Sequence, residues 1–219
     1  MERNDALKAL IRAALAGFEV HPLSRPGHRV AAVALAIVDE GCGADVTGML
    51  PPDGWSTRAA MVLTRRSSTL RNHAGQWALP GGSMDAHESA EQAALRELHE
   101  EAGLVLAPDA VLGRLDDYVT RSGFVITPVV VWAGPATTLV PDAQEVESIH
   151  RIPLTEFLRG DAPVYETIAE STQPALRMPV GERTIAAPTA VFLYQFRELC
   201  LLGRTTRVAH FEQPLFAWK

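Results

Sequence analysis

Cysteine is scarce in this sequence, and basic residues are not in excess. The chain has two cysteines, Cys42 and Cys200, without the paired spacing of a zinc site or a thioredoxin-type site. We interpret them as idle thiols in a reducing compartment. Lys and Arg number 20 against 26 Asp and Glu, so the formal net charge is −6. Because duplex-binding proteins usually present a basic surface, we expect no nucleic acid as a partner.

Long apolar runs are also missing. None reaches the roughly 20 residues that a membrane-spanning helix needs, so we expect no membrane partner. The first twenty residues lack the uninterrupted apolar core and the cleavage site of a signal peptide, which favours a cytoplasmic protein. Hydrophobic residues still make up 47% of the chain and charged residues 21%. These shares are typical of a globular protein that buries a sizeable core.

The pattern of apolar residues and breakers predicts one mixed α/β domain over residues 1–219. Gly and Pro between residues 40 and 56 indicate a loop or flap, and residues 160–186 are rich in loops and stay unassigned. The expected helices are 4–17, 153–158 and 189–202. The expected strands are 30–38, 60–64, 111–119, 124–132 and 145–152, with a hairpin turn at 121–123.

One further helix, between Ser89 and Gly103, concentrates the acidic residues. Ser89 and Gln92 form a capping-box pair, and Gly103 stands where a helix needs a left-handed terminator. Between these ends, three glutamates at spacings i, i+3 and i+4 project within about 100° of one another. They are Glu97, Glu100 and Glu101.

Such carboxylates repel one another, by roughly 0.2–0.5 kcal/mol per pair even when exposed. A hard divalent cation turns that repulsion into attraction, because Mg²⁺ prefers oxygen ligands and shares them with substrate phosphates. Three glutamates alone fit a solvated acidic helix face better than a metal site. We also expect Ala90 and Ala94 on the acidic side, where small side chains leave space for a ligand.

The residues around the glutamates change this balance. The segment GSMDAHESAEQAALRELHEEAGL, residues 82–104, resembles the Nudix box, which fixes nine positions at defined spacing. Chance agreement at nine positions is very rare. The residues that fill them are Gly82, Glu88, Arg96, Glu97, Leu98, Glu100, Glu101, Gly103 and Leu104.

The resemblance implies an α/β/α sandwich in which a loop–helix–loop lies against a central mixed β-sheet. It also implies hydrolysis of a nucleoside diphosphate linked to another moiety, with Mg²⁺ or Mn²⁺ as cofactor. By position in the box, Glu97 and Glu101 would be the main metal ligands, with Glu100 in the same cluster and the backbone carbonyl of Gly82 nearby.

Further roles follow from the same resemblance. Arg96 and Glu88 would orient the helix and its loop rather than take part in chemistry. A general base is needed to activate water, and the sequence singles out none. Glu100 is our first candidate. Glu145 is the second, since the family often recruits an acid from a loop there, although an ordinary surface glutamate is the simpler interpretation.

A second motif precedes the box. VLTRRSSTLRNHAGQWALPGG, residues 62–82, resembles the extra motif of the coenzyme A pyrophosphatase branch of the Nudix family. Trp77 and Leu79 replace the usual valine and phenylalanine, and a bulky Trp77 is expected to reshape the pocket. The matching residues are Leu63, Thr64, Arg66, Ser67, Leu70, His73, Gly75, Pro80, Gly81 and Gly82.

The chemistry of this motif suits a small, coenzyme A-like nucleotide. Coenzyme A carries a diphosphate and a 3′-phosphate, and guanidinium groups match phosphate oxygens. His73 is expected to donate to a phosphate or to orient the water. A solvated basic turn and a structural histidine are the simpler alternatives. The candidate substrate-binding residues are Arg65, Arg66, Arg71, His73, Gly81 and Gly82.

The expected products are 3′,5′-ADP and 4′-phosphopantetheine, with acyl-CoA as a further substrate. Two other functions stay open. The first is another Nudix activity, such as an ADP-ribose or NADH pyrophosphatase. The second is a non-catalytic nucleotide-binding or regulatory protein, against which the retention of all three glutamates argues. A homodimer is also left open.

Overall fold

The structure, a computed structural model, describes residues 1–70 and 73–214. Arg71, one of the expected substrate-binding residues, lies outside the described residues.

The α-helices are α1 (Asp5–Ala16), α2 (Ala90–Ala102) and α3 (Thr189–Phe196), which continues as a π-helical turn, Arg197–Leu201. Two 3₁₀ turns are Pro108–Ala110 and Leu154–Leu158. The strands are β1 (Arg29–Gly41), β2 (Ser56–Arg66), β3 (Trp77–Ala78), β4 (Gly81–Ser83), β5 (Val111–Arg114), β6 (Tyr118–Val119), β7 (Phe124–Gly134), β8 (Val146–Pro153), β9 (Val164–Glu166), β10 (Ala175–Val180) and β11 (Arg183–Ala186).

The main sheet is mixed, as expected, and β1 lies at its centre. Its strand order is β3-β2-β1-β7-β5, with β1 antiparallel to β2 and parallel to β7. Short strand β4 pairs with the beginning of β1, placing Gly82 opposite Ala32 and Gly81 opposite Val33. The loop that precedes α2 is therefore anchored to the central strand.

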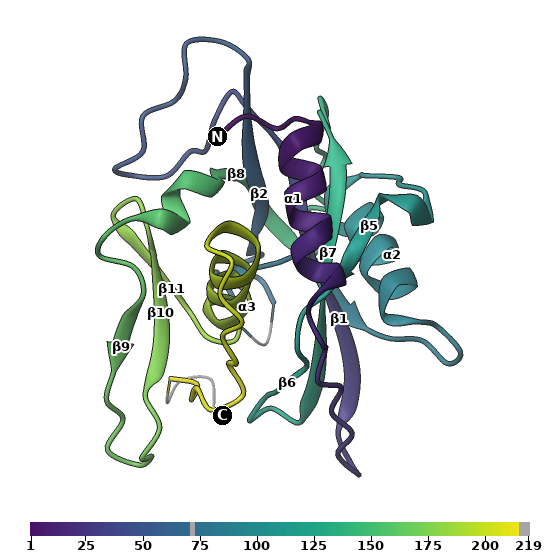
Figure 1. Ribbon diagram of the computed structural model, residues 1–219, viewed down its shortest axis with the longest axis vertical. Helices are drawn as coiled ribbons and strands as arrows, with labels where there is room; N and C mark the ends of the chain where they lie inside the picture. Colours follow the sequence, from purple (N-terminus) through teal and green to yellow (C-terminus); the bar gives the residue numbers. More distant parts are fainter. Residues whose placement is uncertain (71–72, 215–219) are drawn as a thin grey trace.

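Side chains of β1 alternate between two cores, as the period of a strand requires. Leu35 and Ile37 belong to the core that also holds residues of α1 and α3. Ala34, Ala36 and Val38 belong to the second core, which holds the buried side of α2. The result is the expected α/β/α order, with α2 on one face of the sheet and α1 and α3 on the other (Figure 1).

The contact between α2 and the sheet is built mainly from alanines. Ala90, Ala93 and Ala94 of α2 are buried in the same core as Ala34 and Ala36 of β1. The expectation that Ala90 and Ala94 leave space for a ligand beside the glutamates was wrong, because both pack against the sheet. Small side chains on both surfaces let helix and strand approach closely.

The expected strand 111–119 is interrupted after Arg114. Between β5 and β6, Asp116 and Asp117 are buried and accept hydrogen bonds from the backbone N–H groups of His21 and Leu23, each at 2.8 Å. These carboxylates hold the segment after α1, and the backbone leaves the regular ladder there. The remaining expected strands and helices match β1, β2, β7, β8, α1, α3 and the 3₁₀ turn after β8.

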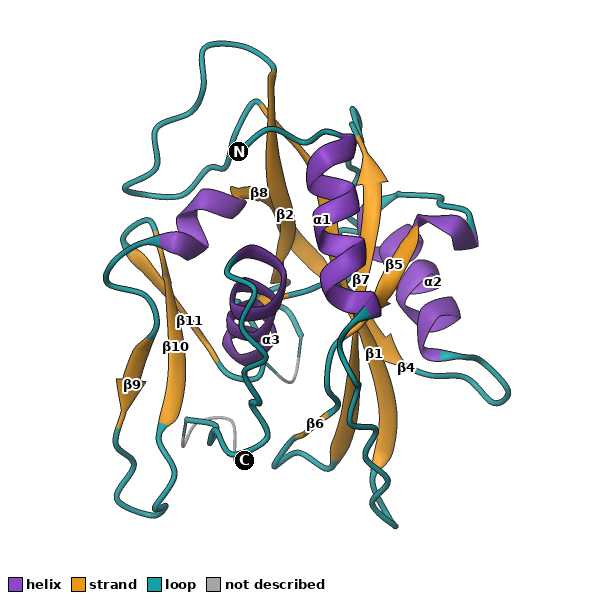
Figure 2. Ribbon diagram, viewed as in Figure 1, coloured by secondary structure: helices purple, strands orange, loops and turns teal. Residues whose placement is uncertain are grey.

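Residues 160–186, left unassigned by the sequence, contain a second sheet of order β11-β10-β9. Pro179 lies inside β10 opposite Thr184, so the strand does not have the regular signature of a buried strand. In Figure 2, α3 lies between this small sheet and the main sheet. The C-terminal half of the chain thereby covers one face of the main sheet.

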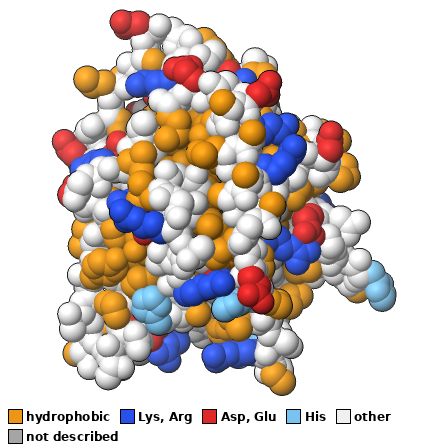
Figure 3. Space-filling model, viewed as in Figure 1, with side chains coloured by type: hydrophobic (Ala, Val, Ile, Leu, Met, Phe, Trp, Pro, Cys, Tyr) orange, Lys and Arg blue, Asp and Glu red, His pale blue; other side chains and the backbone are white. Residues whose placement is uncertain are grey.

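The surface shows mixed charge. On the face drawn in Figure 3, Lys and Arg side chains are separated by acidic and apolar ones rather than gathered in one stripe. Cys42 is exposed and Cys200 is buried, and both are free. In the part of the chain that the structure describes, no helix has the length and apolar character needed to cross a bilayer.

Candidate active site

Helix α2 begins and ends as its sequence predicts. The Ser89 hydroxyl accepts from the Gln92 N–H at 3.2 Å, and the Gln92 side chain accepts from the Ser89 N–H at 2.8 Å. At the other end Gly103 has φ of 70°, the left-handed conformation that glycine adopts without strain. These two caps fix the register of the helix and so the direction of its glutamates.

The loop before α2 can approach β1 only because it contains two glycines. A Cβ atom on Gly81 would lie 2.4 Å from the carbonyl oxygen of Ala32, a distance that real side chains do not tolerate. A Cβ atom on Gly82 would collide with the carboxylate of Glu97. The backbone of this glycine loop, Gly81–Gly82, therefore lies in direct contact with both the central strand and α2.

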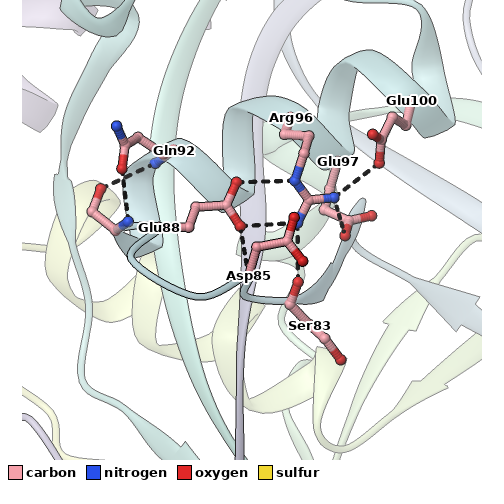
Figure 4. A network of polar contacts seen from close by, with 8 residues as sticks. Ser83, Asp85, Glu88, Gln92, Arg96, Glu97 and Glu100 are labelled. Carbon is pink, nitrogen blue, oxygen red and sulfur yellow. Dashed lines mark hydrogen bonds and ion pairs between the residues drawn. The ribbon is translucent and has the colours of Figure 1, made fainter.

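Arg96 holds the loop in place through Glu88. Its Nε and Nη2 donate to the two carboxylate oxygens of Glu88 at 2.9 and 3.0 Å, and Nη2 also donates to the Ser83 carbonyl at 3.0 Å (Figure 4). Glu88 in turn accepts from the Asp85 N–H at 2.9 Å. The hydrogen bond from Arg96 holds the pKa of Glu88 below its usual value. This network joins α2 to the loop that precedes it.

The three glutamates of α2 have different surroundings. Glu97 and Glu101 are buried, whereas 54% of the Glu100 side chain is exposed. Arg96 Nη1 donates to both Glu97 and Glu100 at 2.9 Å, as Figure 4 shows. Glu100 therefore faces Arg96 at the surface, while Glu97 and Glu101 face the interior.

Glu101 is the most perturbed of these acids. Burial first, and then the charge of Glu97, raises the pKa of Glu101 to about 8, with Glu145 acting in the same direction and Arg66 opposing it. Burial also raises the pKa of Glu97, again with a contribution from Glu145. Perturbation by burial together with like charges is characteristic of functional sites.

Glu145 reaches this region through the backbone. The Ser67 N–H, at the end of β2, donates to the Glu145 carbonyl at 2.8 Å. That bond ties the loop before β8 to the strand that carries Arg65 and Arg66. Two elements distant in sequence thereby bring Arg66 and Glu145 near the acids of α2.

Arg66 and His73 of the upstream motif lie beside the Gly81–Gly82 loop, in the wall of one cavity. Arg65 Nη2 donates to the Gly75 carbonyl at 3.2 Å, and His73 Nδ1 lies 3.2 Å from the Gln76 side-chain oxygen. Among the described residues, the buried Nε atoms of Arg65 and Arg66 have no hydrogen-bond partner. These guanidinium groups therefore have donor capacity that the described chain does not use.

A cavity of about 270 Å³ opens beside the glycine loop. Its walls bring together the loop, the upstream motif, β1, β7 and the C-terminal half of the chain. Among the residues that line it are Arg66, His73, Trp77, Gly81, Gly82, Phe124, Thr189 and Phe192.

Comparison with known proteins agrees with this geometry. The family model described as NUDIX domain matches residues 49–171, more than half of the chain. This chain belongs to the Nudix family. The matched segment contains the whole of α2, the glycine loop and Glu145.

Two relatives illustrate the relationship, and one solved structure is reported beside them. The uncharacterized Nudix hydrolase NudL of Photorhabdus laumondii is 31% identical over 154 residues, 70% of this chain and 75% of that protein. The peroxisomal coenzyme A diphosphatase ndx-8 of Caenorhabditis elegans is 39% identical over 118 residues, 52% of this chain and 50% of that protein. The crystal structure of the MutT protein from Methanosarcina mazei Go1 is 19% identical, with a TM-score of 0.49 over 82% of this chain and 96% of that one. The chain is a Nudix hydrolase, a pyrophosphohydrolase.

Nudix hydrolases generally use divalent metal ions, and the residues here fit one. Glu97 and Glu101 are buried oxygen donors, and the charge of Glu97 raises the pKa of Glu101. Carboxylate oxygens crowded in this way are the donors that a hard cation prefers. Within residues 1–70 and 73–214, however, no three His, Cys, Asp or Glu side chains converge closely enough to hold an ion. Glu100 is engaged by Arg96, and Glu145 is the acid that acts on both buried glutamates.

Part of the Nudix cavity was not anticipated from the sequence. Phe192 is buried in the core, and it also lines the cavity together with Thr189. Trp77 lines the same cavity, and its ring is tilted against that of His150 with the two centroids 4.7 Å apart. No local signal marks Thr189 or Phe192, because only the tertiary fold brings them beside the glycine loop.

Proposed function

We propose that this Nudix hydrolase cleaves the diphosphate bond of coenzyme A or an acyl-CoA, releasing 3′,5′-ADP and (acyl-)4′-phosphopantetheine. The observation that carries the proposal is the position of Arg66, which lines the cavity beside Gly81 and Gly82 and acts electrostatically on Glu101. The resemblance of residues 62–82 to the coenzyme A motif, and the similarity to ndx-8, support the choice of substrate.

Mg²⁺ or Mn²⁺ would be held by Glu97 and Glu101, with the Gly82 carbonyl as a further oxygen donor. When bound, such an ion neutralises diphosphate oxygens and lowers the pKa of a coordinated water. The chain itself contributes the orientation of these donors. Arg96 positions Glu97 through Nη1 and the loop through Glu88.

A proton must leave the attacking water, and two carboxylates are candidates to accept it. The Glu100 carboxylate is already engaged at the surface by Arg96 Nη1, which it shares with Glu97. Glu145 raises the pKa of both buried glutamates, so its charge lies near them. We therefore favour Glu145, and Glu145→Gln is expected to lower kcat more than Glu100→Gln.

The basic residues would bind the substrate rather than react with it. Arg66 would donate to the diphosphate from the cavity wall, because its buried Nε has no partner among the described residues. Arg65, whose Nε is likewise without a partner there, would assist from the neighbouring position on β2. His73 would donate to a phosphate from the cavity wall. Neutralising the diphosphate in this way also favours charge transfer to the leaving phosphate.

A substrate panel read by mass spectrometry tests the proposal. Coenzyme A, an acyl-CoA, ADP-ribose, NADH and a deoxynucleoside triphosphate are each incubated with the protein and Mg²⁺ or Mn²⁺. We expect 3′,5′-ADP from coenzyme A and the acyl-CoA at rates above those for the other substrates. Turnover of ADP-ribose or NADH with coenzyme A untouched would overturn the substrate assignment and leave the Nudix chemistry intact.

A further inference from the structure

A second cavity, of about 260 Å³, adjoins the one beside the glycine loop. The two cavities share five wall residues, in two segments of chain: Gln76, Trp77, Ala187, Pro188 and Thr189. The Trp77 side of the first cavity is thus also a wall of the second. Two parts of one extended ligand would lie on either side of this common wall.

The second cavity is polar at the end that the first does not reach. Its additional wall residues are Arg177, Thr184 and Ala186, from β10 and β11. Arg177 pairs with Ala186, and Thr184 lies two residues before Ala186 on the same strand. Because alternate residues of a strand share a face, Arg177 and Thr184 present their side chains on the same side of the small sheet.

The guanidinium group of Arg177 is only partly engaged by hydrogen bonds to described residues. Its Nε donates to Glu166 of the neighbouring strand at 2.6 Å. Among the described residues, no hydrogen bond involves its Nη1 or Nη2. Only 28% of the Arg177 side chain is exposed, so the guanidinium group lies in the cavity wall rather than free in water. A half-buried guanidinium with two free nitrogens is suited to a phosphate.

We propose that Arg177, assisted by the Thr184 hydroxyl, binds a phosphate monoester on the part of the substrate that is remote from the diphosphate being cleaved. The diphosphate would lie beside Gly81 and Gly82, and Trp77 would form the apolar wall between the two anions. The identity of the substrate rests on the proposed function. In coenzyme A the group concerned is the ribose 3′-phosphate.

The competing explanation is that the Arg177–Glu166 ion pair merely joins β9 to β10. Two variants separate these possibilities, because Arg177→Gln and Glu166→Gln both break the pair and only the first removes the phosphate donor. We compare kcat/KM for coenzyme A and for its analogue without the 3′-phosphate. Arg177→Gln is expected to lower kcat/KM about tenfold for coenzyme A and to leave the analogue unchanged.

Glu166→Gln is the matched control and is expected to preserve or raise kcat/KM for coenzyme A, since it removes a competing carboxylate. Equal losses in both variants, or equal losses on both substrates, would assign a structural role to Arg177 and overturn the proposal. Unchanged kcat/KM of Arg177→Gln on coenzyme A would overturn it as well.

A binding experiment tests the phosphate site without measuring turnover. We expect the wild-type protein to bind 3′,5′-ADP about tenfold more tightly than 5′-ADP by calorimetry, and Arg177→Gln to lose this difference. If coenzyme A is not hydrolysed but this preference for 3′,5′-ADP still depends on Arg177, the proposed function fails and the phosphate site stands. If coenzyme A is hydrolysed and the preference is absent or survives in Arg177→Gln, the site fails and the function stands.

Discussion

The carboxylate of Glu97 lies against the backbone of Gly82, so closely that a Cβ atom at position 82 would stand 2.2 Å from Oε1 and 2.6 Å from Cδ. Gly82→Ala must therefore displace Glu97 or the loop. Because a misplacement of about 1 Å in an active site costs about 10²-fold in rate, we expect a kcat loss of that order in steady-state kinetics.

Gly160→Ala is the control for this substitution. A Cβ atom on Gly160 meets nothing within 4 Å, and its backbone is not left-handed. We expect its kcat and thermal stability to match those of the wild type. Full activity of Gly82→Ala would show that the contact between Gly82 and Glu97 does not matter for catalysis.

Replacing Glu101 by Gln tests whether the buried acids are held together by a cation. In EDTA near pH 9, above the folded-state pKa of about 8, Glu101 is ionised beside Glu97 and destabilises the fold. We expect Glu101→Gln to raise Tm under these conditions. Ions at about 100 times their Kd stabilise a protein by about 2.7 kcal/mol, and the variant should lose most of that gain from Mn²⁺.

The exposed Glu147, on β8, provides the control for the metal experiment. Glu147→Gln should keep both the Tm in EDTA and the increase on adding Mn²⁺. An increase in Tm of the same size in Glu101→Gln and in the wild type would remove Glu101 from the set of metal ligands.

Arg96→Lys tests the role of the guanidinium fork. A lysine cannot donate to both oxygens of Glu88 and also to Ser83 and Glu97, although it keeps the charge. Loss of these charge-assisted bonds should cost about 1–2 kcal/mol of stability and lower kcat about tenfold, because the loop is no longer fixed.

Arg114→Lys is a matched control, because Arg114 lies on β5 and forms an ion pair with the same helix. Arg114 donates through Nε and Nη2 to Glu91, in the first turn of α2 and away from the glycine loop. We expect its denaturation curve to shift in the same direction while kcat stays unchanged. A similar fall in kcat for both variants would mean that activity follows the general stability of α2.

His150 should make stability depend on pH. Burial lowers the pKa of His150, so the folded protein binds its proton less readily than the unfolded chain. Stability is therefore fully present above the unfolded pKa of about 6.5 and is lost as pH falls below it. Urea denaturation between about pH 8 and pH 5 should show this loss, and His150→Gln should reduce its slope.

The exposed His21 is the control, since its contact with Asp116 uses the backbone N–H. His21→Gln is expected to keep the wild-type slope of stability against pH. An unchanged slope in His150→Gln would show that His150 does not contribute to acid sensitivity.

The sequence predicted those parts of the site that depend on local spacing. The caps at Ser89 and Gly103 follow from residue types at the two ends of one helix. The pairing roles of Arg96 and Glu88 came from the resemblance to the Nudix box. The mixed sheet and the layer order were likewise predicted, through the resemblance to the Nudix family. The assignment of the whole chain to one domain stays a prediction.

Other features depend on contacts that no local pattern reveals. Ala90 and Ala94 were placed on an open side because an alanine that packs against alanine has the same sequence signature as one beside empty space. Strand β10 was not predicted, because Pro179 interrupts the usual pattern of a strand. Phe192 lines the cavity only because of how α3 packs. Similarly, Glu145 and Arg66 meet the acids of α2 because β8 pairs with β2.

The two faces of the main sheet carry different parts of the site. The alanine contact fixes the acidic helix on one face with no slack, whereas aromatic and polar residues from the C-terminal half build the cavity walls on the other. Changes to those walls, at Trp77 or Thr189 for example, can alter which nucleotide is accepted without moving the acids. Natural variation or protein engineering can thus change the preferred substrate through the cavity wall, while the acidic residues that act on the diphosphate stay the same.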